Sequence, residues 1–303
     1  MLLSLILSSF LTFVELNCEN LFDTRHDVGK EDSEFLIGGA RHWTEQKYWL
    51  KLNRIGQEIL SCSDELPALV ALCEVENDSV LRDLTRRSLL RGAGYEYLMT
   101  QSPDVRGLDV ALLYRPAKFR PICYEEITVP LVGEMRPTRD VLYVKGETVR
   151  GDTLHIYVLH APSRYGGEQV SRPYRLQVMK VLETSLPSMP AHVIVTGDFN
   201  DYDKSASLRE LERVGLVNVS KHARGGNGAR GTYRYQGEWR SLDHFLVTPS
   251  MLPKIDSVYI NDMPFLLEEE SKYGGKRPKR TFQGMRYRKG FSDHLPLVLR
   301  LKL

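Results

Sequence analysis

The stretch that decides the fold is VIVTGDFND, residues 193–201. Its first four residues are apolar or β-branched, which is typical of a short strand that is covered on both faces. The residues that follow end this strand and place Asp198 and Asn200 at its carboxyl end. Ligands of open α/β sheets bind where such strand ends meet, so we expect this segment to contribute to a functional site.

Other apolar strand candidates are bordered by polar residues in the same way. These residues are Asn17 after residues 10–16, Glu74 after 68–73, His160 after 154–159, Asp243 within the start of 242–247, and Asp293 and His294 before 295–301. One such residue would be a cap or a turn, but six in equivalent places predict one shared site. Carboxylates with an amide suit a hard divalent cation, and two histidines suit proton transfer.

Amphipathic segments lie between the strands. Residues 44–60 predict a helix with Thr44 as its N-cap, and residues 79–90 predict a second helix. A third is expected over residues 169–182, with Pro173 delaying the start of its regular part. This alternation is typical of an α/β fold, and the absence of a linker in the sequence predicts one domain over residues 1–303.

The composition is that of an average globular protein. The chain has 303 residues, of which 42% are hydrophobic and 26% charged. These proportions exclude a disordered, collagen-like or coiled-coil protein. The formal net charge of +2 is too small to indicate a polyanion binder by itself. Four cysteines without a CxxC pair do not form a disulfide framework, and Cys18 and Cys73 are expected to be buried thiols.

The first 14 residues carry no charge. This stretch is too short to span a bilayer, and it resembles the apolar region of a signal peptide without the usual basic residues or cleavage site. We interpret residues 1–9 as a signal-like remnant and the following residues as the first strand. The sequence favours a cytoplasmic location and leaves export open; it indicates no transmembrane segment and no obligate protein partner.

Seven blocks occur in an order that resembles a known family. They are LNCENLFD (16–23), ALCEVEN (71–77), LDVALLYRP (108–116), LHAPSR (159–164), TGDFND (196–201), SLDHFLV (241–247) and FSDHLPL (291–297). The chain resembles the endonuclease/exonuclease/phosphatase superfamily, whose members are metal-dependent phosphoesterases built like deoxyribonuclease I. The resemblance implies a four-layer sandwich, in which helices flank two packed, mainly antiparallel or mixed β-sheets.

The resemblance also implies a metal site and its neighbours. Glu74 would be the principal ligand of Mg²⁺, for which Mn²⁺ would substitute. Asn17 would help to place the metal and the phosphate, and Asp293 would be a second contributor. Asp109, in the motif GLD, would lie near the substrate. Mg²⁺ keeps several waters and takes few protein ligands, so this small set is sufficient.

The remaining positions would carry the chemistry. His160 would contact the scissile phosphate, and Asp198 and Asn200 would orient the attacking water and the phosphate oxygens. His294 would be the general base, held by Asp243. A carboxylate fixes the tautomer of such an imidazole and supports the imidazolium that forms. We expect His244 to point to the opposite face of its strand.

The substrate is the least constrained part of this prediction. Residues 272–289 contain eight basic side chains and no acidic one, interleaved with Tyr273, Phe282 and Tyr287. Such a segment suits a nucleic-acid groove or a phosphorylated inositol headgroup, and it is equally consistent with a solvated loop balanced by residues 268–270. Arg164 is either a phosphate contact beside His160 or an ordinary loop arginine.

Three functions are consistent with these observations. The favoured one is a Mg²⁺-dependent nuclease or phosphodiesterase, in which water attacks the phosphorus in line and the partner is nucleic acid or another phosphodiester. The alternative is a phosphatase or phospholipase-type enzyme that acts on inositol or lipid headgroups or on small phosphorylated molecules. The least favoured is an inactive binding scaffold, because every family position that can be aligned is kept.

Overall fold

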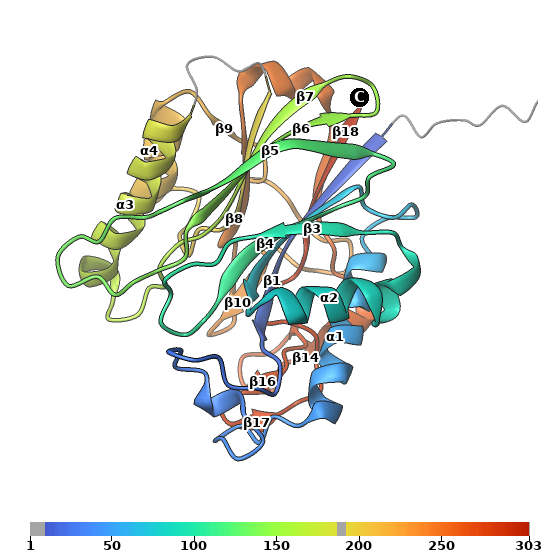
Figure 1. Ribbon diagram of the computed structural model, residues 1–303, viewed down its shortest axis with the longest axis vertical. Helices are drawn as coiled ribbons and strands as arrows, with labels where there is room; N and C mark the ends of the chain where they lie inside the picture. Colours follow the sequence, from blue (N-terminus) through green and yellow to red (C-terminus); the bar gives the residue numbers. More distant parts are fainter. Residues whose placement is uncertain (1–9, 187–191, 303) are drawn as a thin grey trace, which may run out of the picture.

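The computed structural model describes residues 10–186 and 192–302, and the predicted signal-like remnant lies outside them. Two six-stranded sheets pack face to face, and helices cover their outer faces (Figure 1). Buried side chains of both sheets meet between them; the rings of Phe13 and Phe245, one from each sheet, have centroids 5.3 Å apart. The predicted four-layer α/β sandwich is confirmed.

The first sheet has the strand order β13-β18-β1-β2-β4-β3. Its strands are β1 (Phe10–Leu21), β2 (Leu69–Val75), β3 (Glu96–Met99), β4 (Asp109–Tyr114), β13 (Ile255–Ile260) and β18 (Leu297–Lys302). Strands β1 and β2 run parallel at its centre, whereas the other neighbours are antiparallel.

The second sheet has the order β5-β6-β7-β8-β12-β9. Its strands are β5 (Phe119–Ile127), β6 (Val141–Thr148), β7 (Thr153–His160), β8 (Val193–Asp198), β9 (Val217–Asn218) and β12 (Asp243–Val247). Here β7 and β8 form the parallel pair. Each sheet therefore brings the carboxyl ends of two parallel strands to the same end of the sandwich, where the predicted site residues lie.

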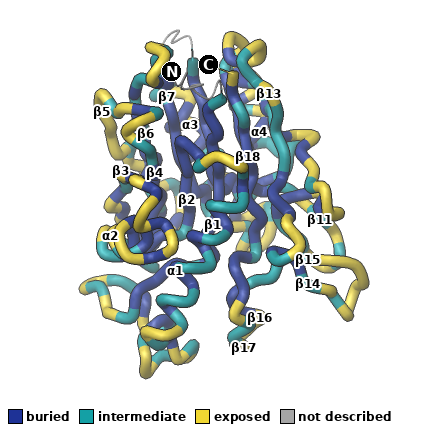
Figure 2. Tube along the Cα trace, turned by 90° about the vertical axis from the view of Figure 1, so that its right-hand side faces the viewer, coloured by how far each residue is buried: buried dark blue, intermediate teal, exposed yellow. Residues whose placement is uncertain are grey.

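Two helices cover each outer face. Helices α1 (Glu45–Leu60) and α2 (Asp78–Arg86) pack on the first sheet, and α3 (Glu168–Ser185) and α4 (Ala206–Arg213) pack on the second. Short 3-10 turns complete the helical segments at Ser33–Phe35, Leu89–Gly92, Pro249–Lys254 and Pro264–Leu266. The central strands and the inner faces of these helices are buried, whereas the outer strand β5 and many loop residues are exposed (Figure 2). No described helix is both long and apolar enough to cross a bilayer.

Three small hairpins lie beyond the site end of the sandwich. They are built from β10 (Tyr233–Tyr235) with β11 (Glu238–Arg240), β14 (Leu267–Glu269) with β15 (Lys276–Pro278), and β16 (Phe282–Gln283) with β17 (Arg286–Tyr287). Figure 1 shows β14, β16 and β17 below the sheets, next to the first turns of α1. Sequence periodicity did not predict these hairpins, because strands of two or three residues are too short to establish an alternating pattern.

The three predicted helices are present, but some of their boundaries differ. Helix α2 ends at Arg86, four residues before the predicted end, and Leu89–Gly92 forms a separate 3-10 turn, whereas α3 continues to Ser185, three residues beyond the predicted end. Thr44 caps α1 through a hydrogen bond that its side chain accepts from the N–H of Lys47. In α3, Pro173 does not delay the start, which lies five residues earlier at Glu168. The missing N–H of Pro173 is tolerated because Ser171 Oγ bonds to the carbonyl of Gly167 at 2.7 Å and Arg175 bonds to Glu168 at 2.6 Å.

Candidate active site

Asn17 links the two sheets at the site. Its Nδ2 donates to Asp198 Oδ2 at 3.0 Å and to Glu74 Oε1 at 3.3 Å. Its Oδ1 accepts the N–H of Glu19 at 2.9 Å, which fixes the orientation of the amide. Asn17 therefore presents its donor side to the two carboxylates. It holds those carboxylates in place, and its predicted help in placing the metal and the phosphate stays a prediction.

Glu74 occupies a strained backbone position. Its φ is +62°, which is rare for a non-glycine residue, and β2 loses register with β4 between Cys73 and Val75. This conformation aims the carboxylate at the site, where Oε2 accepts the N–H of Asn20 at 2.7 Å. Asn20 itself has φ +59° in a matching irregularity of β1. Strain of this kind persists where the surrounding contacts enforce it, as at many functional sites.

Asp198 ends β8 next to a position that only glycine can occupy. Gly197 has φ +137°, and a Cβ there would lie 1.9 Å from the carbonyl oxygen of Leu159. The close approach of β8 to β7 therefore requires this glycine. Asp198 Oδ1 accepts the N–H of Asn200 at 2.8 Å, and Asn200 Nδ2 donates to the carbonyl of Ala161 at 3.0 Å.

His294 and Asp243 form a buried acid–base pair. Nδ1 of His294 lies 2.8 Å from Asp243 Oδ2, and this oxygen also accepts a hydrogen bond from the Thr232 hydroxyl. The loop that carries His294 is held by Ser292, whose hydroxyl donates to the carbonyl of Asn17 at 2.6 Å and accepts the N–H of His294 at 3.1 Å. With Nδ1 engaged, Nε2 faces the centre of the site, 4.0 Å from Asp198 Oδ2.

His160 approaches the same carboxylates from β7. Its Nε2 lies 3.6 Å from Asp198 Oδ2 and 3.9 Å from Glu74 Oε1. Arg139 supports this strand end because its guanidinium donates to the backbone carbonyls of His160, at 3.2 Å, and Ala161, at 3.0 Å. Asp198 therefore stands between two imidazoles, and both reach it through Nε2.

The two imidazoles have opposite electrostatic environments. Burial and the nearby guanidiniums of Arg139 and Arg106 hold the pKa of His160 well below its usual value. Burial lowers the pKa of His294 too, but Asp243, Asp198 and Asp293 outweigh it and keep that pKa well above the usual value. Burial, with Asp243 as a close negative neighbour, raises the pKa of Asp198 to about 7. At neutral pH, His160 is therefore neutral and His294 is charged.

Three predicted residues are engaged by other partners. Asp293 pairs with Arg280, with Oδ2 2.7 Å from the guanidinium, so its charge is compensated by an arginine. Asp109 accepts hydrogen bonds from the Thr100 hydroxyl at 2.6 Å and the Ser102 N–H at 2.9 Å, and burial raises its pKa to about 6. It supports the end of β2, where it pairs with Val75.

Arg164 is a structural residue of the following loop. Its guanidinium lies 2.6 Å from Asp201 Oδ1 and 2.8 Å from Glu168 Oε2, and it stacks over Tyr202. Of the two interpretations that the sequence allowed, these contacts support the loop arginine. His244 faces away from the site as predicted, with Nε2 2.9 Å from the carbonyl of Asp201.

Several residues of the site were missed by sequence reasoning. They are Thr232, which bonds to Asp243; Ser292 and Arg139, which position the histidines; Arg106, which bonds to the side chain of Asn20; and Tyr233, whose ring centroid lies 5.0 Å from that of His294. Most lie in loops or at loop ends far from their partners in the sequence. Ser292 and Arg106 border quoted motifs, and that proximity was the available signal.

The basic segment 272–289 differs from a nucleic-acid groove. Arg277 pairs with Glu268 at 2.8 Å and Glu270 at 3.1 Å, and Arg288 lies 3.4 Å from Glu268. Phe282 is buried against Trp43, with their ring centroids 5.9 Å apart. The balanced-loop interpretation fits Arg277 and Arg288, whose charges are compensated, and Phe282, whose ring is not available to stack on a base. Among the described residues, no ion pair involves the remaining lysines of the segment or Arg286.

The donor set fits a hard cation. Glu74 and Asp198 present carboxylate oxygens that share the amide of Asn17 as a hydrogen-bond donor. In the described part of the chain, no lysine or arginine forms an ion pair with either carboxylate; the only titratable bases within 4.0 Å are His160, which is near both carboxylates, and His294, which is near Asp198. Adjacent buried carboxylates without such a partner favour a divalent cation, and oxygen ligands suit Mg²⁺ or Mn²⁺. Asp198, Asp243 and His294 also have potential ligand atoms within 4.8 Å of one another, but Asp243 is already bonded to His294 Nδ1.

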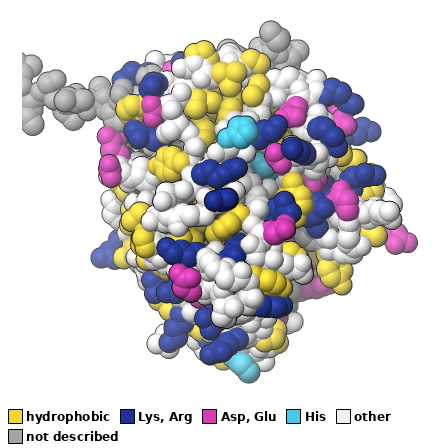
Figure 3. Space-filling model, turned by 180° about the vertical axis from the view of Figure 1, so that it is seen from behind, with side chains coloured by type: hydrophobic (Ala, Val, Ile, Leu, Met, Phe, Trp, Pro, Cys, Tyr) yellow, Lys and Arg dark blue, Asp and Glu magenta, His cyan; other side chains and the backbone are white. Residues whose placement is uncertain are grey.

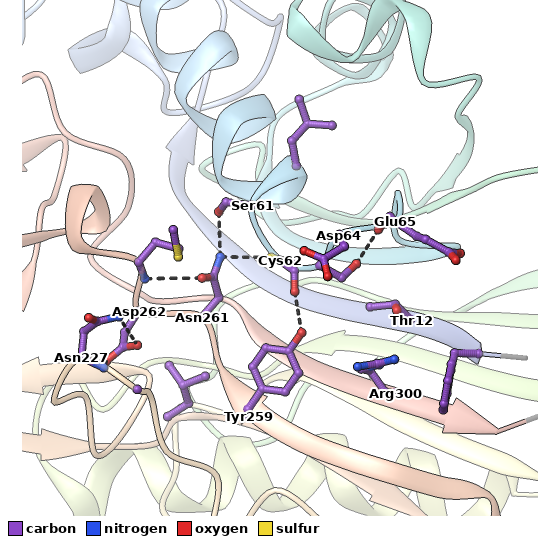
Figure 4. Close-up of a pocket in the computed structure, with 16 residues that line it drawn as sticks. Thr12, Ser61, Cys62, Asp64, Glu65, Asn227, Tyr259, Asn261, Asp262 and Arg300 are labelled. Atoms are coloured by element: carbon purple, nitrogen blue, oxygen red, sulfur yellow. Dashed lines mark hydrogen bonds between the residues drawn. The ribbon is translucent and has the colours of Figure 1, made fainter. Parts of the chain in front are cut away.

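A larger cavity lies away from this chemistry. About 780 Å³ in volume, it is lined by Thr12 and Arg300, near the start of β1 and the end of β18, and by the loop after α1. Figure 4 shows Asn261 and Tyr259 directed at this loop, where Asn261 donates to Ser61 Oγ at 2.8 Å and Tyr259 to the carbonyl of Cys62. Because Thr12 and Asn17 are separated by five residues of extended β1, this cavity is not part of the site.

Comparisons with known proteins agree with this architecture. A mannosyl-6-phosphatase of Bacteroides thetaiotaomicron superposes with a TM-score of 0.64 at 15% identity, covering 97% of this chain and 100% of that chain. TDP2 of D. rerio, complexed with a single-strand DNA product, gives 0.59 at 16% identity, covering 97% and 100%. The human Nocturnin catalytic domain with bound sulfate gives 0.55 at 16% identity, covering 97% and 94%. These likenesses show a shared fold.

The sequence comparison gives the family. No curated protein matches the chain. The model of the endonuclease/exonuclease/phosphatase family matches residues 12–303, which is almost the whole chain. The protein therefore belongs to the endonuclease/exonuclease/phosphatase family of phosphoester-hydrolysing enzymes.

Proposed function

We propose that this protein hydrolyses phosphoester bonds with the help of a divalent cation, Mg²⁺ or Mn²⁺, held by Glu74 and Asp198. The observation that carries the proposal is the meeting of these two carboxylates with two imidazoles, one neutral and one positively charged, at one end of the sandwich. A bound cation would neutralise charge that develops on the phosphate oxygens. Membership of the family supports the reaction class.

The chain's own residues supply proton transfer. Asp198 stands between the two imidazoles and is placed to accept a proton from the attacking water. Burial raises its pKa to about 7, and a cation bound at the same carboxylate would lower that pKa. His294 is held in its charged form by Asp243, so its Nε2–H is a donor to a phosphate oxygen. This division differs from the prediction from sequence, in which His294 is the base. The neutral His160 and the amide of Asn200 complete the phosphate contacts.

The ion pairs of the basic segment change the substrate class that we favour. The sequence favoured a nuclease or phosphodiesterase, largely because of its basic segment. Since Arg277 and Arg288 are paired with glutamates and Arg280 with Asp293 and Glu19, we place a compact phosphate ester ahead of a nucleic-acid strand. The fold accommodates both classes, because a mannosyl-6-phosphatase and a DNA-bound TDP2 share it.

The proposal is tested with p-nitrophenyl phosphate and bis(p-nitrophenyl) phosphate. We expect turnover in Mg²⁺ or Mn²⁺ that is lost in a chelator. Asp198→Asn keeps the shape of the side chain but removes the base, and it should lower kcat at least about a hundredfold. Glu74→Gln should raise the Mg²⁺ concentration that gives half-maximal activity. Wild-type rates in Asp198→Asn, or full activity in the chelator, would exclude this mechanism.

A further inference from the structure

A second, smaller cavity opens beside His294. It has a volume of about 350 Å³ and lies between the β10–β11 and β14–β15 hairpins. Tyr233, Arg280 and Asp293 form the wall nearest the site, and backbone pairing joins Tyr233 to His294. A group attached to a phosphate at the active site can therefore extend into this cavity.

The cavity is built on a rigid frame. The guanidinium of Arg234 donates to the carbonyls of Gly237 at 3.0 Å, Gly274 at 2.7 Å and Lys276 at 2.6 Å. These bonds tie the two hairpins together at their turns. The Arg234 side chain is only 6% exposed, so it is a structural clamp and not a free anion-binding group. The cavity is therefore already formed in the ligand-free protein, as is usual for small-molecule sites.

The arginines of its walls are paired with carboxylates. Arg277 and Arg234 are compensated by Glu270, at 3.1 and 3.4 Å. Arg280 is compensated by Asp293 at 2.7 Å and by Glu19 at 3.4 Å. Lys272 also lines the cavity, where its Nζ lies 4.8 Å from the centre of the Tyr273 ring. Figure 3 shows basic and acidic side chains interspersed on the face of the molecule opposite to that of Figure 1. Because the arginines of the lining are already paired, their charge is largely not free to bind a further phosphate.

Tyrosines and amides complete the lining. Tyr235 and Tyr273 line the cavity with 59% and 44% of their surface exposed. Lys272 lies over one face of the Tyr273 ring and Gln236 donates to the Tyr235 hydroxyl at 3.4 Å, and the exposed parts of both rings remain accessible. Gln236 and Gln283 add uncharged donors and acceptors. A hydroxyl group is both a donor and an acceptor, so paired arginines, carboxylates and amides can satisfy it from either side. Aromatic faces can pack against the C–H groups of a ring.

We infer that this cavity binds the uncharged, hydroxyl-rich part of the substrate, and that the enzyme acts on the phosphate ester of a sugar or polyol. The inference rests on the proposed phosphoesterase function and specifies its substrate class. A nucleic-acid strand would bring further phosphate groups close to Glu270 and Asp293, whose carboxylates would repel them. A neutral sugar or polyol meets no such repulsion.

The test compares two phosphate esters of similar leaving-group basicity, a hexose 6-phosphate and ethyl phosphate. We expect kcat/KM to be at least about tenfold higher for the hexose phosphate, which corresponds to one or two good contacts. Tyr273→Ala and Tyr235→Ala should each raise KM for the hexose phosphate about fivefold and change the values for ethyl phosphate less than twofold. Tyr124→Ala, at a tyrosine that is 54% exposed on β5, is the matched control.

The possible failures can be separated. Two results would overturn the sugar or polyol assignment: equal effects of the tyrosine variants on both esters, or a preference for a single-stranded oligonucleotide over the hexose phosphate. In either case, hydrolysis of p-nitrophenyl phosphate would still support the phosphoesterase function. If no chromogenic ester is hydrolysed, the proposed function fails. Calorimetric binding of the hexose phosphate to wild type and Tyr273→Ala then decides the cavity assignment, since equal binding or none would reject it.

Discussion

Asn17 shows how a single side chain determines the state of its neighbours. Its amide supplies a hydrogen-bond donor to both Glu74 and Asp198, so it reduces the repulsion between two carboxylates before any cation arrives. Because Oδ1 is already bonded to the N–H of Glu19, the amide cannot rotate without losing that bond. An aspartate would fit the same space, but it would increase the repulsion between the carboxylates instead of reducing it.

Asn17→Asp should therefore inactivate the enzyme without unfolding it. A third carboxylate removes the donor and adds like charge, so we expect kcat to fall at least about a hundredfold and the chelated protein to lose on the order of 1–2 kcal/mol of stability. Steady-state kinetics and urea unfolding measure these effects. Asn53→Asp is the control, because Asn53 also accepts a backbone N–H and donates through Nδ2, but on α1. Activity within a factor of two of wild type would contradict the assigned role of Asn17.

At the scale of elements, the two central parallel pairs explain why much of the site was predictable. A strand end followed by a polar residue can be recognised in the sequence, and the strand predicted over residues 154–159 lies within β7. The partners of the site residues could not be found in this way. Thr232 and Arg139 lie in loops whose position depends on packing of the whole chain, and no periodicity marks such residues.

Gly197→Ala tests the close approach of β8 to β7. A methyl group would lie within bonding distance of the Leu159 carbonyl, and φ would remain unfavourable, so the strands must separate. We expect a loss of at least about 3 kcal/mol of unfolding free energy. Gly215→Ala is the control, because Gly215 has φ +96° with open space around it and should lose only about 1 kcal/mol. Equal losses in both variants would show that the contact is not the cause.

Glu58, a buried carboxyl on α1, allows a test of how burial of a charge affects stability. Both oxygens of Glu58 lack a hydrogen-bond partner among the described residues, and burial raises its pKa to about 8. Since the folded pKa exceeds the unfolded value, Glu58 is tolerated at low pH and destabilises the fold as the pH rises from about 4.5 through 8. Glu58→Gln should match wild type at pH 5 and exceed its stability at pH 9 by on the order of 2 kcal/mol.

Chemical denaturation at the two pH values measures this difference. Glu183→Gln, at an exposed position of α3, should show no such dependence on pH. A constant difference between Glu58→Gln and wild type from pH 5 to pH 9 would mean that Glu58 is not neutral in the folded protein.

For the molecule as a whole, the buried carboxyls determine how stability varies with pH. Burial raises the pKa of Glu19 to about 7, Glu58 to about 8, Glu76 to about 9 and Asp198 to about 7. At a pH above the pKa values that these carboxyls have in the unfolded chain, the folded chain therefore holds more protons than the unfolded chain. Stability should fall as the pH rises from 6.5 to 9. At lower pH, His160 and His244 have the opposite effect. Their pKa values are lowered in the folded protein, so the unfolded chain takes up protons at these histidines first and stability decreases as the pH falls.

Melting temperatures in a chelator, measured at pH 6.5, 7.5, 8.5 and 9, test this expectation. A steady decrease supports it, and a melting temperature that rises with pH would contradict it. Excess Mg²⁺ should reduce the decrease, because a cation at Glu74 and Asp198 stabilises the charged carboxylates that the higher pH creates.

The pairing of Asp198 with Asp243 in the ladder between β8 and β12 limits how such a protein can change. Successive side chains of a strand point to opposite faces of the sheet. Deleting or inserting one residue within either strand would therefore turn one of the two aspartates to the face opposite the site. The connection between them, residues 199–242, is restricted only where it makes its own contacts, at β9 beside β12 and at Thr232 and Tyr233 beside the site. Relatives and engineered variants can therefore change the length of the loops between these points, whereas the two strands must be inherited at fixed length.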